Sequence, residues 1–551
     1  MIFRDNPVLI RELLVTLRSS RSFAILFVYV SFLGAVVYFA WPAEGKMVSP
    51  ERAQRLFDMF FLGQFFLVAL VAPSFASGSI AGEKERKTYE MLLASPLRPV
   101  NILIGKLLSS LTYLVILIIS SLPLMILCFL LGGILLSEIA RAYLILILAA
   151  GTFGLLSLAC SSYFGRTSSA LVVSYLVILP LAVVAIVLTR SDDVVLRDFV
   201  SIAVMPPWCL GIWAVVVSLI NRRLLRPPDV GSEGKEVIDE SQEMKYAIGV
   251  VIDRDLFPDK LFAPAKRTDL MPDGTNPVLD KELRSEIFSQ GTLMLRVVIQ
   301  VSMLLSIPLM AALLFLRPEN AAYYVSYVLT FNLLVGPVFS AGSITQERER
   351  QTLSLLLTTL LTPGSIVFAK LVAALRVSTV LTFLLTEQLL LAYVMVEELR
   401  GRFWTLGVFL LIILTTCLAT STIGLLCSAL SRRTSVAMVA TYLVLLILFA
   451  GPIGARKYLE GFQEQLSVGV IESLTISSPY SAAFSVPMAF TPANSPGFQV
   501  GSMQGRTLEI SGVEVPTWAA FLAIYPPACL LLFGTTYLAF RIRWWQAGGT
   551  G

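Results

Sequence analysis

The feature that most constrains the fold of this chain is an internal duplication. Residues 75–107, FASGSIAGEKERKTYEMLLASPLRPVNILIGKL, return as residues 339–371, FSAGSITQERERQTLSLLLTTLLTPGSIVFAKL, with 15 of 33 positions identical. Two shorter blocks flank this one: NPVLIREL at 6–13 returns as NPVLDKEL at 276–283, and CSSYFGRTSSALVVSYLV at 160–177 returns as CSALSRRTSVAMVATYLV at 427–444. The blocks recur in order at offsets of 270, 264 and 267 residues, so the sequence predicts a duplicated unit.

Each unit is strongly apolar. The chain is 56% hydrophobic and 14% charged, with a mean hydropathy of +0.79. It contains twelve apolar runs of about 20 residues, each long enough to cross a hydrocarbon core of ~30 Å as a helix. They centre near residues 31, 66, 118, 152, 178, 213, 304, 333, 380, 416, 443 and 529. The composition therefore predicts an all-α polytopic membrane protein with about twelve transmembrane helices.

Six spans in each half return the chain to the side where it entered, so the two repeats are predicted to be parallel. The loops that carry most of the Lys and Arg place both termini in the cytoplasm, with the first apolar run kept as a span and not removed as a signal peptide. We expect a first six-span unit at 1–225, a polar cytoplasmic linker at 226–275, and a second six-span unit at 276–551. The second unit includes an outer loop at 455–517.

The strongest local motif lies in the cytoplasmic loop between the second and third spans of each half. It follows Gly78 in the first copy and Gly342 in the second. Apolar residues then recur at i, i+3 and i+4, which predicts a short amphipathic helix beneath the bilayer. These residues are Tyr89, Leu92 and Leu93 in one copy and Leu353, Leu356 and Leu357 in the other.

Charged and hydroxyl residues of this loop match between the copies. They are Glu83, Glu85, Arg86 and Thr88 in the first half and Glu347, Glu349, Arg350 and Thr352 in the second. An ordinary interfacial helix with a solvated face would explain one such loop. The preserved charges on the same predicted face favour a docking surface for two similar cytoplasmic partners.

At these residues the chain resembles the membrane subunits of type-2 ATP-binding-cassette (ABC) transporters. Glu-x-Glu-Arg-x-Thr, then Leu-Leu, Pro and a Lys, looks like that family's coupling-helix loop. The Cys-Ser…Arg-Thr-Ser…Tyr-Leu blocks look like its junction between spans four and five, and Asn-Pro-Val-Leu…Glu-Leu is similar to its N-terminal elbow helix. The resemblance implies two facing six-span units, each with a coupling helix docked on a cytoplasmic ABC ATPase subunit, here with two units fused in one chain.

The sequence also argues against several other activities. No Walker A motif is present, so ATP would be bound by the partner subunits and this chain is expected to hold no cofactor and to have no enzymatic activity. The sequence has no His, and its six Cys lie in or beside apolar runs, so neither a metal site nor a catalytic site is expected. The net charge of +5 is spread over many loops, which argues against nucleic acid as a partner.

One acidic residue falls inside an apolar run without a counterpart in the other half. Glu387 lies in the ninth span, and its position in the first half is Pro123. A charge in the bilayer is costly, at ~2.5–3.5 kcal/mol on insertion scales, so Glu387 is a candidate for the translocation path. A structural hydrogen bond to a neighbouring helix is the alternative.

The sequence thus favours the permease of an ABC exporter in a cytoplasmic (inner) membrane, working with two ATPase subunits. An ion-driven secondary transporter is the main competitor, but it should show paired carboxylates or broken helices at matching midplane positions. A membrane anchor that passes ATPase motion to periplasmic partners is a third possibility, kept open by the long outer loop. The substrate does not follow from the residues.

Overall fold

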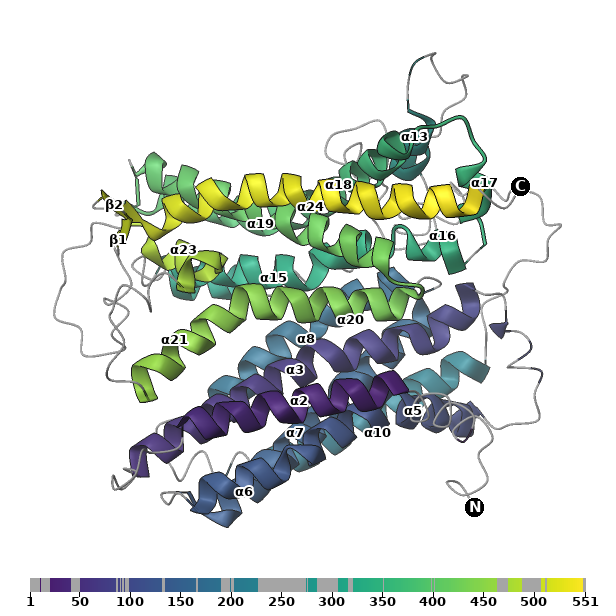
Figure 1. The fold of residues 1–551 in the computed structure, drawn as a ribbon. Coiled ribbons are helices and arrows are strands. Elements are labelled where there is room, and N and C mark those ends of the chain that lie inside the picture. Colours follow the sequence, from purple (N-terminus) through teal and green to yellow (C-terminus); the bar gives the residue numbers. More distant parts are fainter. Residues whose placement is uncertain are drawn as a thin grey trace.

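The computed structural model describes most of the chain as long helices that run nearly side by side (Figure 1). The described residues are 20–40, 50–85, 99–130, 134–164, 167–189, 203–225, 276–284, 306–315, 321–349, 351–397, 399–400, 402–462, 474–487, 507–510 and 513–548, with isolated positions at 10, 88, 89, 91, 94, 199 and 274. All structural statements below concern these residues. Arg86, Arg350 and almost all of the 226–275 linker lie outside them.

The first half contributes α2 (Ser20–Ala40), α3 (Pro50–Glu85), α5 (Pro99–Ser120), α6 (Leu122–Leu130), α7 (Leu136–Tyr163), α8 (Thr167–Thr189) and α10 (Met205–Leu225). The second half begins with α13 (Pro277–Arg284), η2 (Ala311–Phe315), α15 (Ala321–Ala341), α16 (Thr345–Glu349), α17 (Leu353–Leu357), α18 (Pro363–Met395) and α19 (Phe403–Leu430). It continues with α20 (Thr434–Leu445), η4 (Leu446–Ala450), α21 (Gly451–Phe462), η5 (Thr475–Ser477), α23 (Pro479–Ser485), strands β1 (Thr507–Ile510) and β2 (Val513–Pro516), and α24 (Thr517–Gly548).

Within these ranges, eight helices are long and apolar enough to cross a membrane: Ala53–Glu85, Asn101–Ile126, Leu136–Tyr163, Ala321–Glu349, Pro363–Met395, Phe403–Leu430, Val436–Arg456 and Thr517–Ile542. Helices α2, α8 and α10 fill three further positions at which the sequence predicts a span, and the run near residue 304 is described only from 306 to 315. The prediction of an all-α polytopic protein is confirmed.

The duplication extends to the packing of the helices. In the first half α3 packs against α7, α5 against α7, and α7 against α10; in the second half the corresponding pairs are α15 with α19, α18 with α19, and α19 with α24. The helices of each half thus have equivalent neighbours. The chain consists of two copies of one helical arrangement, as the repeated blocks predict.

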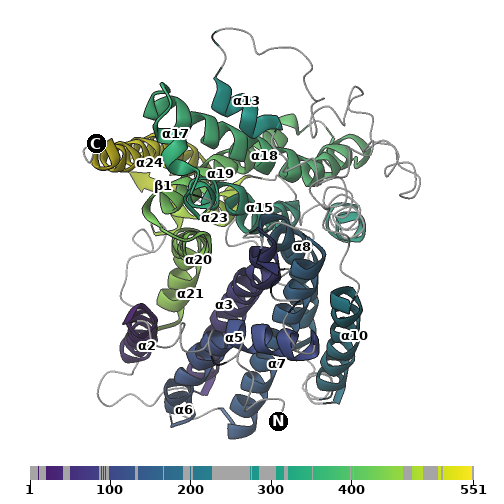
Figure 2. The same cartoon turned by 90° about the vertical axis from the view of Figure 1, so that its right-hand side faces the viewer.

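The two halves meet through reciprocal helix pairs. Helix α8 of the first half packs against α15 of the second, and α20 of the second packs against α3 of the first. Figure 2 looks along the helices and shows α8 beside α15 at the boundary between the halves. One hydrophobic core cluster crosses this boundary, with Leu70 and Leu176 from one half and Leu334 and Met438 from the other. Packed side chains therefore fill the interface between the halves in this structure.

The interface contains a matched pair of tyrosines. Tyr175 of α8 and Tyr442 of α20 occupy equivalent repeat positions, and their rings meet edge to face with centroids 5.4 Å apart. Both side chains are almost completely buried, at 1% and 0% exposed. Two equivalent residues in contact define the point where an approximate two-fold axis passes between the halves.

A buried layer of side chains differs between the halves. Asn332 of α15 donates to hydroxyls of α18, Ser378 Oγ at 3.0 Å and Thr382 Oγ1 at 3.0 Å, and accepts from Thr420 Oγ1 of α19 at 3.2 Å. The repeat positions in the first half are all apolar and buried. They are Val68, Leu114, Ile118 and Phe153. A polar cluster thus joins three helices in one half where side-chain packing joins them in the other.

The end of the molecule that holds α23 and the β1–β2 hairpin lies opposite the end that holds α16 and α17 (Figure 1). Trp404, at the start of α19, and Trp518, at the start of α24, pack edge to face there with centroids 6.4 Å apart. Helix α21 also reaches the other half, because Tyr458 Oη donates to the Val36 carbonyl oxygen of α2 at 2.9 Å. Helix α21 of the second half is therefore attached to the first half.

Candidate functional site: the two coupling loops

The repeated loop begins differently in the two halves but ends in the same way. Helix α3 continues through Gly78 to Glu85, whereas α15 ends at Ala341 and a turn separates it from α16. The helix is therefore interrupted at Gly342 but not at its repeat counterpart Gly78. Beyond the glycine, both copies form the same helix ending, because the amide of Thr88 donates to the Glu83 carbonyl oxygen at 3.0 Å, as Thr352 does to Glu347 at 2.9 Å.

This six-residue closure is the Schellman motif, in which the residue after the helix adopts a left-handed conformation. Gln351 is that residue in the second half, with φ of 60°. The spacing Glu-x-Glu-Arg-x-Thr therefore has a structural cause. Its first Glu and its Thr are the two ends of the closure, and the Thr hydroxyl also donates to the Glu carboxylate in both copies.

The first Glu of each loop pairs with a buried lysine of the following span. Lys106 Nζ lies 3.2 Å from Glu83 Oε1, and Lys370 Nζ lies 3.6 Å from Glu347 Oε1. Both lysines are 2% exposed. A buried ammonium group is stable only when it is paired and hydrogen-bonded, so each loop is fixed to the span that follows it.

In the second half this ion pair extends to the predicted elbow helix. Helix α13 carries Lys281, which lies 2.9 Å from Glu347, and Glu282, which lies 2.7 Å from Lys370. Asn276 caps α13 by accepting from the Val278 amide, and its side-chain amide donates to the Ser365 carbonyl oxygen of α18. The elbow, the loop and the next span are thus one connected unit. The first elbow lies almost entirely outside the described residues.

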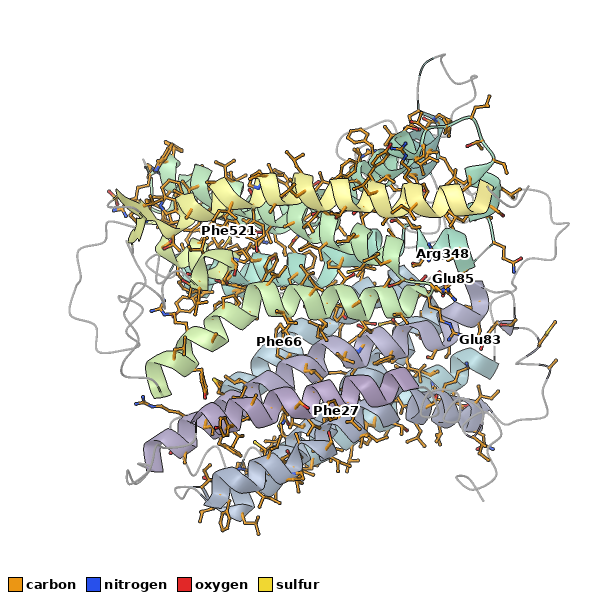
Figure 3. The ribbon with its side chains drawn as sticks, viewed as in Figure 1. Phe27, Phe66, Glu83, Glu85, Arg348 and Phe521 are labelled. Atoms are coloured by element: carbon orange, nitrogen blue, oxygen red, sulfur yellow. The ribbon has the colours of Figure 1, made fainter. Side chains whose placement is uncertain are left out.

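The second Glu of each loop bonds to the start of the fifth span. Glu85 accepts from the backbone N of Thr167 at 3.1 Å and from its Oγ1 at 3.2 Å. Glu349 accepts from the same two atoms of Thr434, both at 3.1 Å. Figure 3 shows Glu83, Glu85 and Arg348 at one end of the helical assembly. The carboxylates that the sequence suggested as a docking surface therefore make internal contacts, and this explains why they match between the copies.

The apolar residues of the loop separate into an inner and an outer set. Leu353, Leu356 and Leu357 pack against the core cluster around Ile344 and Ile366, and Tyr89 is buried in the first half. The amphipathic face predicted from the spacing is thus present in α17. Leu92 and Leu93 lie outside the described residues.

The outer set is exposed at the same repeat position in both halves. Met91 is 76% exposed and Leu355 is 69% exposed, and the two positions differ by the repeat offset of 264. Sequence reasoning missed this pair. The sequence does carry a signal for it. Both copies have an apolar residue at this position, although the position does not belong to the i, i+3, i+4 set that faces inward.

Helix α18, which carries Glu387, packs against helices of its own half, α13, α15, α19 and α24. The Glu387 side chain is exposed on α18, on a face it shares with the exposed Phe383 and Leu391, whereas the next residue, Gln388, is buried and accepts from Tyr324 Oη at 2.9 Å. Since α18 continues to Met395, Glu387 lies about 12 Å from the C-terminal end of the helix and not at its middle. This placement gives no support to a role in a path between the halves.

The described residues offer little for covalent or metal chemistry. They contain no group of three or more Cys, Asp or Glu side chains that could hold a metal ion. The charged groups that do converge are ion pairs and helix caps at one end of the assembly. The arrangement is suited to transmitting mechanical force between a loop and a set of helices.

Two copies of one helical arrangement, joined along an approximate two-fold axis and carrying paired loops at one end, define a two-repeat polytopic membrane protein. Residues 23–209 match a family model described as ABC-2 family transporter protein, and residues 289–543 match a second ABC-2 family transporter protein model. The chain therefore belongs to the ABC-2 transporter family, with two permease domains in one polypeptide. No curated protein matches it significantly.

Proposed function

We propose that this chain is the complete membrane part of an ABC exporter of the cytoplasmic membrane, in which each repeat docks one ATPase subunit. ATP binding would draw the two ATPase subunits together, and the two loops would pass that motion to the helices. The substrate would then cross between the halves, where side chains now pack closely. The chain itself would contribute no ATP-binding or catalytic residue.

The observation that carries this proposal is the exposed apolar pair Met91 and Leu355. Each lies at the same position of a repeated loop, beside charged residues that hold the loop to the transmembrane helices. Exposed apolar side chains at matched positions suit two copies of one partner. Membership of the ABC-2 transporter family supports an ABC ATPase subunit as that partner.

Co-purification of the ATPase subunit tests this assignment. The double substitution Met91→Asp with Leu355→Asp should abolish recovery of the ATPase from cells in which the chain is properly inserted, because it places charge in an apolar contact. Leu135→Asp, at a 65% exposed position just before α7 and at the end of that helix away from the loops, is the matched control and should leave recovery unchanged. Full recovery with the double variant would mean that the ATPase docks elsewhere.

A membrane anchor that transmits ATPase motion to outer partners remains the second candidate. The observation in its favour is the outer segment with α21, α23 and the β1–β2 hairpin, which has no equivalent of similar length in the first half. An anchor would retain ATP-dependent motion of the helices without any substrate flux. Cross-linking from α23 to outer-membrane or periplasmic proteins would distinguish it from an exporter.

A further inference from the structure

The second Glu of each coupling loop connects the loop to a different helix from the one that the loop leads into. Glu85 and Glu349 each use both carboxylate oxygens, one on the backbone N and one on the hydroxyl of the first residue of the fifth span. A carboxylate at a helix N-terminus is favoured by the exposed N–H groups and by the helix dipole. Two charge-assisted bonds to one residue also fix its orientation and not only its distance.

Further contacts attach the loop to the turn that precedes the fifth span. In the second half Arg348 donates to the Ser431 carbonyl oxygen, and Ser428 Oγ accepts from the Ile344 amide at 3.0 Å. The first half repeats both contacts. Lys84 donates to the Phe164 carbonyl oxygen at 3.3 Å, and Ser161 Oγ accepts from the Ile80 amide at 3.1 Å.

Each fifth span leads directly to the interface between the halves. Tyr175 and Tyr442 lie eight residues beyond Thr167 and Thr434, about 12 Å along the helix. Tyr175 Oη donates to the Leu70 carbonyl oxygen at 2.7 Å, and Tyr442 Oη donates to the Leu334 carbonyl oxygen at 2.6 Å. A displacement at the start of α8 or α20 therefore reaches the tyrosine pair through a single continuous helix.

We infer that Glu85 and Glu349 are positioning residues that transmit loop movement to the fifth spans and so to the tyrosine pair at the two-fold axis. The inference rests on the proposed function, since the movement originates in the ATPase. It divides the loop into two kinds of residue. Met91 and Leu355 bind the partner, whereas Glu85 and Glu349 act inside the chain and leave partner binding unchanged.

Distance measurement by double electron–electron resonance tests this division. Spin labels at Tyr163→Cys and Leu430→Cys report the separation of the two turns before the fifth spans, because these residues share one repeat position and are 46% and 56% exposed. The six native Cys are first replaced by Ser or Ala. The complex with its ATPase is measured with and without a non-hydrolysable ATP analogue.

The unmodified loops should give a shift of the distance distribution when the analogue binds. Glu85→Ala with Glu349→Ala should lose that shift while the ATPase co-purifies at the wild-type yield. Thr167→Val with Thr434→Val, which removes only the hydroxyl bonds at constant volume, should give a smaller shift than wild type. Thr167→Ser with Thr434→Ser keeps both bonds and should restore the full shift.

A shift of wild-type size in the double Ala variant would overturn the inference, and so would a loss of ATPase binding in that variant, which would assign the carboxylates to docking. If the carboxylates only stabilise the fold, the Thr→Val and Thr→Ser double variants should give the same distance shift. That result would also overturn the inference. If the unmodified chain binds no ATPase or shows no shift, the proposed function fails first and the inference falls with it.

Discussion

Tyr175 and Tyr442 touch each other across the boundary between the two halves, with ring centroids 5.4 Å apart, although 267 residues separate them in the chain. Each hydroxyl donates to a carbonyl oxygen of a neighbouring helix in its own half. The contact joins two equivalent residues, so it identifies the symmetry of the assembly at a single point.

Replacing either tyrosine hydroxyl should destabilise the protein modestly. Tyr442→Phe keeps the ring contact but leaves the Leu334 carbonyl oxygen without this donor, at a cost of about 0.5–1.5 kcal/mol. Tyr175→Phe should cost somewhat more, because the Tyr175 hydroxyl also lies 2.8 Å from Ser74 Oγ. SDS-induced unfolding in detergent micelles measures both values. A large effect from one variant with none from the other would contradict an equivalent role.

Much of this architecture could be predicted from the sequence, because duplication and apolar runs are local patterns. The repeated blocks and the number of spans per half fix parallel repeats before any contact is known. Tyr175 and Tyr442 lie in a repeated block, but a single tyrosine in an apolar run gives no sign of which helix it faces. Their contact depends on the angle between the halves, which no local pattern determines.

The role of the loop carboxylates was less predictable. A matched charge in a loop between two spans can face a partner or face inward, and the sequence pattern is the same in both cases. The threonine partners of Glu85 and Glu349 lie 82 and 85 residues further along the chain, in a different repeated block. Only the packing of the fourth and fifth spans beside the loop brings these blocks together.

The asymmetric polar layer gives a prediction with opposite outcomes in the two halves. Val68→Asn places an amide among Leu114, Ile118 and Phe153, none of which has a side-chain hydrogen-bonding group, and should destabilise the protein by about 1–3 kcal/mol. Asn332→Val should cost less, because Thr382 and Thr420 also donate to carbonyl oxygens of their own helices. SDS-induced unfolding in detergent micelles compares the two variants. Equal losses would mean that the layer contributes nothing specific.

The buried lysine of the first half should depend on its carboxylate. Glu83→Ala removes the group 3.2 Å from the Lys106 ammonium and should destabilise the loop and third span by about 1–3 kcal/mol. Lys106→Met with Glu83→Gln removes both charges and should recover most of that loss. Thermal unfolding followed by tryptophan fluorescence measures this. If the double variant is no more stable than Glu83→Ala, the carboxylate does not act by compensating the charge of the Lys106 ammonium group.

The left-handed residue at the end of α16 offers a stabilising substitution. Gln351→Gly removes the steric cost of φ at 60° and should raise stability by about 0.5–1 kcal/mol after the entropy of glycine is counted. Gln351→Val, with a branched side chain in the same conformation, should lower it. If both substitutions shift the melting temperature in the same direction in a thermal scan, residue 351 does not end the helix in a left-handed conformation.

The central claim is that one chain supplies both halves of the permease, with one ATPase docking position in each. Native mass spectrometry of the complex purified from cells measures this most directly. The account predicts a mass equal to one chain of 60.4 kDa plus two ATPase subunits, and loss of one ATPase when only Leu355 or only Met91 is replaced by Asp. A complex of two chains with two ATPase subunits would contradict it, because each chain would then provide a single docking position.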